Sequence, residues 1–379
     1  MALRLGILKE SAAGETRVAL LPDAVKSFAA MGMKVVVEAG AGISAGIADA
    51  AYEAAGAALT VDRRALLESA DLLPVVTPFA AEEQRHLKQG AVVAGFLRPL
   101  DEPAALLPAV ERGATLFALE LVPRISRAQS MDALSSQAAV AGYKAVLIAA
   151  NTLEKFLPML TTAAGTIRPA SALVIGAGVA GLQAIATARR LGAVVEAYDV
   201  RSATKDQVKS LGAKFVETGV SAEGTGGYAR ELTAEEKQKQ QEVLDARIAA
   251  SDIVISTASV PGRAAPRIIG RAAVERMKAG SVIVDIAAEQ GGNCELTRAG
   301  ETVLHGGVKI VGPVNLPASL PYHASEMYAR NLFNLLKPAL SKGELAIDWN
   351  DEVFAGAVLT HDGQIKHEAT RKTLEGQSS

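Results

Sequence analysis

The chain has 379 residues, enough for two or three domains that each bury a core of their own. Its formal net charge of −2, with 21% charged residues, argues against nucleic acid or an anionic membrane surface as a partner. A single cysteine, Cys294, excludes an internal disulfide framework, and the five scattered histidines form no metal-ligand cluster. Residues 1–11 are too short and too soon charged to be a signal peptide.

The first 120 residues alternate short apolar runs with alanine-rich helical patterns. Strands are expected over 3–8, 34–40, 71–76, 91–97 and 114–120, and helices over 22–32, 48–56, 80–90 and 102–113. Strands that alternate with helices predict a parallel, doubly wound sheet.

The middle of the chain predicts a second domain reached through a long helix over 131–157. Further strands are expected over 171–175, 194–200, 214–217, 252–258, 281–287 and 308–312. A second long helix over 319–340 and a hairpin over 354–367, turning at Asp362-Gly363, carry the chain back. We therefore predict an α/β fold of two Rossmann-like doubly wound parallel-sheet domains joined by long helices: residues 1–135 with 322–379, and residues 136–321.

The most apolar window, residues 170–188, has the length of a membrane span. Its glycines indicate a strand, a turn and a helix instead, so we expect a soluble protein.

That same window carries the clearest motif, "GAGVAG", in which Gly176, Gly178 and Gly181 lie between a strand and a helix. The first glycine permits a tight turn, the second lets a pyrophosphate approach the backbone, and the third allows close helix–strand packing. The helix N-terminus, beginning near Val179, offers free N–H groups to phosphate oxygens. The motif predicts dinucleotide binding; the alternative is a packing turn without a ligand.

The residues after the next strand bear on which dinucleotide is bound. Asp199 lies eighteen residues after Gly181, at the strand end, where a carboxylate accepts both ribose hydroxyls of NAD(H) and repels a 2′-phosphate. Arg201 argues against this assignment, because an arginine at that position can favour the binding of NADP. We expect NAD(H), since Asp199 occupies the strand-end position itself.

Two later segments offer further candidate contacts. Residues 221–241 carry Gly227 and Tyr228 among other glycines, which fits either a mobile flap over the cofactor or a surface connection. The turn after strand 252–258 presents Ser256, Thr257 and Ser259 at the carboxyl edge of the sheet.

Residues 124–137, "RISRAQSMDALSSQ", gather hydrogen-bonding groups but contain no histidine, cysteine or lysine. One interpretation is a solvated helix N-terminus with Ser130 as its cap and Asp132 in the first turn. The other is that Arg124, Gln129, Asp132 and Ser136, with Ser135 beside it, orient a nicotinamide ring without moving a proton. The residues alone leave both open.

Taken together, "RISRAQSMD…LSSQ", "AGVAGLQAIATARRLGAVVEAYDVR", "GGYARE" and "GGNC" resemble the soluble NAD(H)-binding α component of proton-translocating nicotinamide nucleotide transhydrogenase, a family related to alanine dehydrogenase. The resemblance runs from residues 7–22 to residues 359–367. It implies a homodimer that docks with an NADP(H)-binding subunit and passes hydride directly from NADH to NADP⁺, in the Re/Si-specific reaction. It also implies a membrane subunit that couples transfer to proton translocation, and a place for this chain at the cytoplasmic face of the membrane. Because no membrane helices follow residue 379, we expect them on separate subunits.

The resemblance also assigns site residues. It implies nicotinamide contacts from Arg124, Gln129, Asp132 and Ser135. It places the dinucleotide against Gly176, Gly178, Val179, Gly181, Asp199, Val200, Arg201, Gly227, Tyr228, Gln240 and Ser259. Ser259 departs from the family pattern, which often has an apolar residue there.

Two alternatives remain at this point. An alanine dehydrogenase needs a carboxylate-binding arginine, which Arg17 matches, and a proton-handling lysine and histidine. The matching segments, residues 71–78 and 92–99, contain neither. Hydride transfer between two nicotinamides needs no acid or base, which favours the transhydrogenase; a non-catalytic NAD-sensing module is the other alternative.

Overall fold

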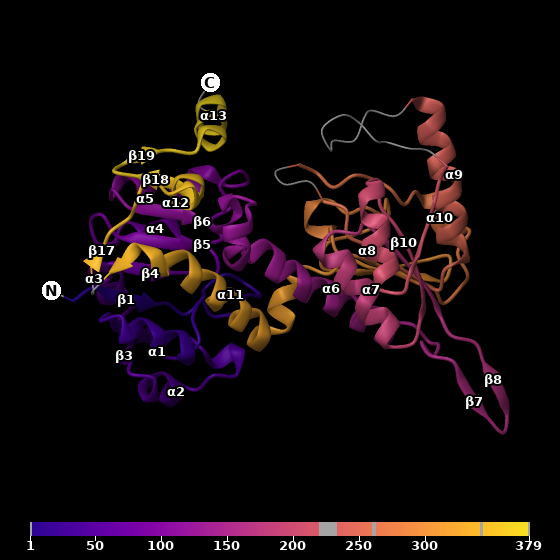
Figure 1. Ribbon diagram of the computed structural model, residues 1–379, viewed down its shortest axis with the longest axis horizontal. Helices are drawn as coiled ribbons and strands as arrows, with labels where there is room; N and C mark the ends of the chain where they lie inside the picture. The colour runs from indigo at the N-terminus through magenta and orange to yellow at the C-terminus, as the bar shows by residue number, and fades with distance from the viewer. Residues whose placement is uncertain (1, 220–232, 260–262, 342–343, 378–379) are drawn as a thin grey trace. The chain divides into compact units, whose positions relative to one another are not determined.

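The computed structural model describes residues 2–219, 233–259, 263–341 and 344–377 (Figure 1). The chain divides into two compact units: unit 1 comprises Met1–Gln137 with Pro317–Ser379, and unit 2 comprises Ala138–Leu316. From the sequence, the divisions were expected at 135/136 and 321/322. Unit 1 is thus built from both ends of the chain.

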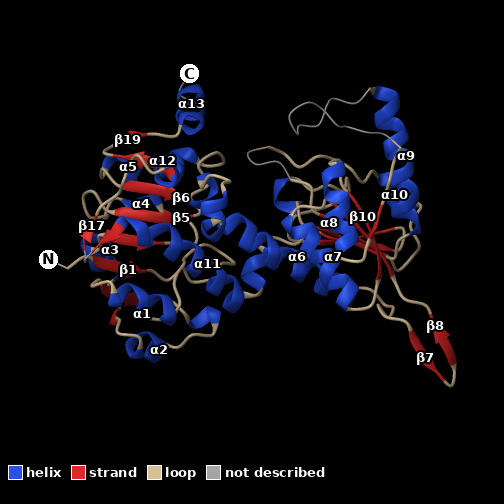
Figure 2. Cartoon of the chain, in the orientation of Figure 1, coloured by secondary structure: helices blue, strands red, loops and turns tan. Residues whose placement is uncertain are grey.

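Unit 1 is organised around an eight-stranded sheet, drawn in red in Figure 2. The strand order is β19-β18-β6-β5-β4-β1-β2-β3, with β1 to β6 parallel and the β18–β19 hairpin antiparallel at one edge. Its strands are β1 (Arg4–Ile7), β2 (Lys34–Glu38), β3 (Ala58–Thr60), β4 (Leu72–Pro74), β5 (Val92–Gly95), β6 (Thr115–Ala118), β18 (Val358–His361) and β19 (Gln364–Ile365). The order reverses between β1 and β4, as in the Rossmann fold.

The helices of unit 1 are α1 (Pro22–Ala30), α2 (Asp49–Ala54), α3 (Arg63–Ser69), α4 (Ala81–Gln84), α5 (Leu107–Glu111), α11 (Pro321–Leu336), α12 (Glu352–Ala357) and α13 (Glu368–Gln377), with a small hairpin of β16 (Leu340–Ser341) and β17 (Glu344–Leu345). The helix expected over 102–113 is divided into a 3₁₀ turn (Pro103–Leu106) and α5. Pro108 lies at the start of α5, because proline has no N–H to continue a preceding helix.

Both faces of this sheet are covered, which explains its continuous apolar strands. Leu72 and Phe117 pack in one hydrophobic cluster, whereas their neighbours Leu73 and Leu116 pack in a second. Adjacent residues of a strand point to opposite faces, so the two clusters are the two sides of one sheet.

Unit 2 repeats the arrangement with a seven-stranded sheet in the order β11-β10-β9-β12-β13-β15-β14. Its strands are β9 (Ser171–Ile175), β10 (Val194–Tyr198), β11 (Lys214–Phe215), β12 (Ile253–Ser256), β13 (Val282–Asp285), β14 (Thr302–His305) and β15 (Val308–Val311), and only β14 is antiparallel to its neighbour among these described strands. The order reverses between β9 and β12. The structure thereby confirms the expected α/β class with doubly wound, mainly parallel sheets.

The helices of unit 2 are α7 (Val179–Arg190), α8 (Lys205–Ser210), α9 (Ala234–Ala250) and α10 (Arg271–Glu275), joined by most of α6 (Ala133–Thr152). An additional antiparallel hairpin, β7 (Leu160–Thr162) with β8 (Gly165–Ile167), extends from this unit (Figure 1). No strand was expected there from the sequence, which predicted helix as far as residue 157.

The long helix is therefore shorter than expected at both ends. Before it, Ser126–Met131 form a 3₁₀ turn, and α6 itself begins at Ala133. After Thr152 the chain leaves the helix, and the Leu157 carbonyl accepts a hydrogen bond from Ala170 N (3.0 Å), which joins the segment to the start of β9. The hairpin turn at Asp362-Gly363 is confirmed, with φ of 50° and 72° at the two residues.

Helix α6 is long and apolar enough to cross a membrane by length and composition alone. Its residues Ala141, Ala145, Val146 and Ala149 pack in a hydrophobic cluster of unit 2, which accounts for that composition. On the same helix, a Cβ at Gly142 would lie 2.0 Å from the carbonyl oxygen of Ala180 in α7. The two helices therefore approach so closely that only glycine fits.

Because of this contact, we expect a glycine-to-alanine substitution in α6 to destabilise the protein, the reverse of the usual effect. Glycine to alanine inside a helix ordinarily stabilises by about 0.5–1 kcal/mol. We expect Gly142→Ala to lower the free energy of unfolding by about 1–3 kcal/mol, because the methyl group would force α6 and α7 apart. Urea unfolding of the full chain measures the difference. Gly270→Ala is the control for a glycine without close contacts: it is the N-cap of α10, its Cβ would meet nothing closer than Glu295 Oε2 at 4.0 Å, and we expect it to cost less than about 1 kcal/mol. A stabilised Gly142→Ala chain would contradict the prediction.

Candidate functional site

The glycine turn of unit 2 lies where the strand order reverses. Strand β9 ends at Ile175, Gly176 adopts a φ of +98°, and Gly178 is the N-cap of α7. The first helical hydrogen bond runs from Leu182 N to Gly178 O (2.8 Å), so the helix starts directly after the turn. Its first N–H groups have no partner within the helix and point toward the carboxyl edge of the sheet.

The three glycines of this turn are needed for different reasons. A Cβ at Gly181 would lie 1.8 Å from the Gly176 carbonyl oxygen, and a Cβ at Gly176 would lie 2.4 Å from Thr257 Oγ1. Protein packing therefore explains these two. Gly178 is different: its φ is −78°, and an added Cβ would meet no atom within 4 Å. Neither backbone conformation nor packing requires a glycine there, and its small size leaves the backbone at the start of α7 open to a ligand.

Asp199 lies beside this turn and already has partners. Its Oδ2 accepts from Ala177 N (2.7 Å), and its Oδ1 accepts from Arg201 N (2.8 Å) and Arg201 Nε (2.9 Å). Burial alone would raise the pKa of this carboxyl, but the bonds from Arg201 and from the backbone outweigh it and hold the pKa below its usual value. The charge of Arg201 is thus largely committed to Asp199.

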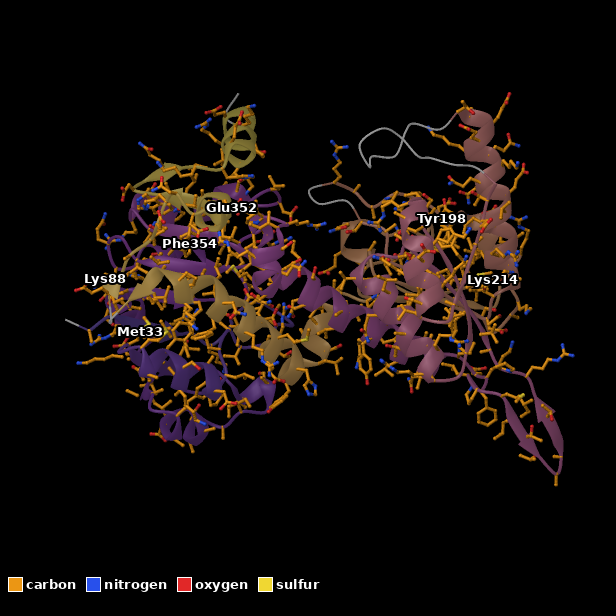
Figure 3. All side chains as sticks on the ribbon, viewed as in Figure 1. Met33, Lys88, Tyr198, Lys214, Glu352 and Phe354 are labelled. Atoms are coloured by element: carbon orange, nitrogen blue, oxygen red, sulfur yellow. The ribbon has the colours of Figure 1, made fainter. Side chains whose placement is uncertain are left out.

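Neighbouring residues complete this edge. Tyr198, the last residue of β10, is labelled in Figure 3; burial raises the pKa of its hydroxyl to about 12. Val200 and Val179 are exposed apolar side chains, 54% and 43% accessible; Val200 follows Asp199, and Val179 begins α7. Both are free to cover a ligand at the carboxyl edge.

The turn after β12 only partly matches expectation. Thr257 Oγ1 donates to the Ile175 carbonyl (3.2 Å), so Thr257 packs against the glycine turn. Ser259 is exposed. Ser256 was wrongly expected to face a ligand: its hydroxyl is fully buried and donates to Asp285 Oδ1 (3.0 Å). Gln240 is half-buried on α9, and Gly227 and Tyr228 lie outside the described residues.

The polar cluster of residues 124–137 lies in unit 1. Asp132, not Ser130, is the residue at the start of α6: its Oδ1 accepts from Ser135 N (2.9 Å) and its Oδ2 accepts from Ser135 Oγ (2.6 Å). The expectation of Ser130 as cap was wrong because Ser130 still belongs to the preceding 3₁₀ turn. Asp132 and Ser135 therefore form one hydrogen-bonded pair at a helix N-terminus.

The 3₁₀ turn is held in place from α11. The Ser130 carbonyl accepts from Asn331 Nδ2 (2.9 Å) and Asn334 Nδ2 (3.1 Å). Arg124 and Gln129 on this segment are exposed. Within the described part of the chain, neither side chain is engaged in an ion pair or a hydrogen bond, so a cation and an amide remain available beside the Asp132–Ser135 pair.

Arg17 of unit 1 is engaged within the protein. Its Nε and Nη2 donate to the two carboxylate oxygens of Glu15 (2.8 and 2.7 Å), and its Nη1 donates to Gln137 Oε1 (2.9 Å). All three residues are buried. The Arg17 guanidinium is therefore paired with the Glu15 carboxylate within the protein.

The carboxyl ends of β4 and β5 are closed by apolar groups and one tyrosine. The Tyr328 hydroxyl donates to Val75 O (2.7 Å) and accepts from Phe96 N (3.1 Å), and burial raises its pKa. Nearby Glu10 accepts from Val76 N (2.6 Å), and burial raises the pKa of its carboxyl to about 7. Sequence patterns did not single out Tyr328 or Glu10, because their partners are far along the chain.

Comparison with known proteins matches the chain to two domain models of one family. Residues 6–141 match the family model described as alanine dehydrogenase/PNT, N-terminal domain, and residues 145–368 match alanine dehydrogenase/PNT, C-terminal domain. The chain is 46% identical to a Rhodospirillum rubrum protein named as the first portion of the NAD(P) transhydrogenase α subunit, and the alignment covers 100% of both chains. It is 27% identical to alanine dehydrogenase of Bacillus subtilis, over 98% of this chain and 94% of that protein.

A solved structure gives the same result. The transhydrogenase of Sinorhizobium meliloti superposes with a TM-score of 0.87 at 46% identity, covering 96% of this chain and 99% of that one. These matches confirm the resemblance drawn from the glycine turn and the polar cluster. The chain belongs to the alanine dehydrogenase/PNT family, and within it to the branch of the NAD(P) transhydrogenase α subunits.

Proposed function

We propose that the chain is the NAD(H)-binding subunit of a proton-translocating NAD(P) transhydrogenase, the donor half of a direct hydride transfer. Relatives at 41–46% identity are named as transhydrogenase α subunits. The observation that carries the proposal is Gly178, a glycine that neither φ nor packing requires, at the start of a helix next to a buried carboxylate. A dinucleotide pyrophosphate needs that open approach to the backbone.

The proposal assigns each part of NADH to a set of residues. The pyrophosphate binds the helix N-terminus from Gly176 to Gly181, and the adenosine ribose hydroxyls bind Asp199 beside Val200. Arg201 is held by Asp199, so a 2′-phosphate would have to displace an ion pair of 2.9 Å, which favours NADH over NADPH. Gly227, Tyr228, Gln240 and Ser259 are proposed as further contacts from the resemblance alone.

The nicotinamide is assigned to Arg124, Gln129, Asp132 and Ser135. These groups can bind the carboxamide and fix the ring plane, and they include no histidine, lysine or cysteine to carry a proton. None is needed: the C4–H bond of the dihydronicotinamide breaks as its electron pair forms a C4–H bond on the acceptor nicotinamidium. Both electrons and the hydrogen move together, and no proton is exchanged. Orientation is the protein's whole contribution at this step.

The alanine dehydrogenase alternative meets a specific obstacle. Such an enzyme must bind a substrate carboxylate and move protons. Here Arg17 holds Glu15, and the segments 71–78 and 92–99 contain no lysine or histidine. An NAD-sensing module would share the dinucleotide site and differ only in lacking transfer.

The remaining elements of the proposal concern partners. NADP(H) is bound by a separate subunit, a membrane subunit couples transfer to proton translocation, and this chain is a homodimer at the cytoplasmic face. The relatives from Rhodospirillum rubrum and Rickettsia prowazekii are named as one portion of a divided α subunit, which supports an assembly of separate chains.

Reconstitution tests the proposal. The purified chain, mixed with the NADP(H)-binding subunit, should transfer hydride from NADH to an NADP⁺ analogue at a rate far above either component alone. No rate above the separate components would contradict the proposal and favour a sensor. NADH formation from NAD⁺ and L-alanine by the chain alone would favour the dehydrogenase instead.

Asp132 allows orientation to be separated from stability. Asp132→Asn keeps an oxygen that can accept from Ser135 N but removes the charge, so we expect transfer to slow about tenfold or more while the NADH dissociation constant changes less than about threefold. Asp132→Ala should in addition cost about 1 kcal/mol of stability, because the cap is lost.

The matched control is Asp62→Asn. Asp62 caps α3 in the same way, accepting from Ala65 N (2.9 Å), and should leave transfer and affinity unchanged. Equal losses of transfer and affinity in Asp132→Asn, from single-turnover rates and calorimetric titration, would refute the assigned role.

Asp199 should behave in the opposite way. Removing a charged hydrogen-bond acceptor costs about 1.5–3 kcal/mol, so we expect Asp199→Ala to raise the NADH dissociation constant about ten- to a hundredfold, with transfer at saturating NADH little changed. Asp252→Ala is the control, because Asp252 is a similarly buried carboxylate at the opposite end of the same sheet, bonded to Ser171 N (2.9 Å). Unaltered affinity in Asp199→Ala would remove this residue from the site.

A further inference from the structure

The motif "GGNC" follows β13 and is unusually buried for a turn. Gly291 and Gly292 both have left-handed φ, 95° and 84°, and Asn293 and Cys294 are fully buried behind them. A buried asparagine needs partners for its whole carboxamide. The proposed function assigns no role to Asn293.

Those partners are backbone groups of Ala258, 35 residues earlier in the chain, and of Pro266, 27 residues earlier. Asn293 Oδ1 accepts from Ala258 N (3.0 Å), and Asn293 Nδ2 donates to Ala258 O (2.7 Å) and to Pro266 O (2.9 Å). One side chain therefore satisfies both backbone groups of Ala258 and also binds Pro266. It joins Ala258 and Pro266, which both follow β12.

Asp285 fixes the turn from which Asn293 projects. This carboxylate is fully buried and accepts from Ser256 Oγ (3.0 Å), Cys294 N (2.9 Å) and Thr297 Oγ1 (2.7 Å). A Cβ at Gly292 would lie 2.7 Å from Asp285 Oδ2, so the turn packs directly on the carboxylate. The strand end of β13 thereby determines where the Asn293 carboxamide is aimed.

Ala258 in turn lies against the glycine turn. A Cβ at Gly176 would lie 3.5 Å from Ala258 N, and the preceding residue, Thr257, bonds the Ile175 carbonyl. Gly176 and Ala258 thus flank the place where the strand order of the sheet reverses, between β9 and β12. Ligands of doubly wound folds lie there.

We propose that Asn293 is a positioning residue of the dinucleotide site, which holds the Thr257–Ala258 backbone against Gly176 through its carboxamide. The inference rests on the proposed function and deepens it. Asn293 is buried and does not touch the dinucleotide. It fixes the position of the Thr257–Ala258 backbone, which the dinucleotide meets. Its loss weakens NADH binding and leaves transfer at saturation nearly unchanged.

Asn293→Asp tests this with little change of shape. The introduced carboxylate keeps the acceptor for Ala258 N but faces the carbonyls of Ala258 and Pro266 with a second acceptor. Once protonated, it can donate to one of them. Burial beside two carbonyl oxygens raises the pKa of such a carboxyl, so binding should recover as the pH falls. Asn293→Ala removes the same bonds without a titratable group.

The NADH dissociation constant is measured by calorimetry on the full chain from about pH 8 to about pH 5.5. At the upper pH we expect it to rise about tenfold in both variants. At the lower pH it should return to within about threefold of the wild-type value in Asn293→Asp but not in Asn293→Ala. Ser281→Ala is the control, because Ser281 is equally buried at the opposite end of β13, donating to Ser251 O (3.3 Å), and should bind NADH as the wild type does.

Wild-type affinity in folded Asn293→Ala overturns the inference, and so does weakening in Asn293→Asp that does not respond to pH. If Asn293→Asp fails to fold at the upper pH, the affinity of Asn293→Ala decides. Failure of the wild-type chain to bind NADH at all would instead overturn the proposed function. Loss of affinity in Ser281→Ala equal to that in Asn293→Ala would show a general effect of buried substitutions and also contradict the inference.

Discussion

The close approach of the Gly176 carbonyl to Gly181 is the contact on which the candidate site depends. Because a Cβ at Gly181 would lie 1.8 Å from that oxygen, α7 can begin directly above the end of β9 only with glycine there. The helix N-terminus is thereby fixed at the carboxyl edge of the sheet. Asp199 accepts a hydrogen bond from Ala177 N in the same turn. On the β12 side, Thr257 donates to the Ile175 carbonyl, and Asn293 accepts from Ala258 N. At Gly178, in contrast, an added Cβ would meet no atom within 4 Å.

The two units have related sheet topologies but different chemistry at the corresponding edges. In unit 2 the edge combines an open helix N-terminus with a carboxylate whose pKa is lowered. In unit 1 the edge is closed by Tyr328, by valines and by the Arg17–Glu15 pair. Unit 2 thus carries the features of a dinucleotide site, and the polar cluster of unit 1, residues 124–137, contains no histidine, lysine or cysteine. That combination fits the donor half of a hydride transfer better than a complete dehydrogenase.

Sequence patterns predicted what depends on local spacing. The alternating strands and helices, the glycine turn, Asp199 and the Asp362-Gly363 hairpin turn are all set by residues close together in the chain. The start of α6 was misassigned, because Ser130 and Asp132 are both good cap residues. Ser130 lies in the preceding 3₁₀ turn, where its carbonyl bonds Asn331, 201 residues later. From the sequence, Ser256 was expected to face a ligand, but its side chain is buried and its hydroxyl donates to Asp285 Oδ1. Likewise Arg17 bonds Gln137 across 120 residues, and Asn293 bonds Ala258 across 35, so neither spacing carries a recognisable pattern.

A crystal structure of the chain with NADH is the most direct test of the proposed site. We expect the pyrophosphate oxygens within about 2.7–3.2 Å of the backbone nitrogens at the start of α7. We also expect the nicotinamide carboxamide within hydrogen-bond distance of Arg124, Gln129 or Asp132. NADH bound with its ring away from all three residues, or with its pyrophosphate away from Gly178, would contradict it.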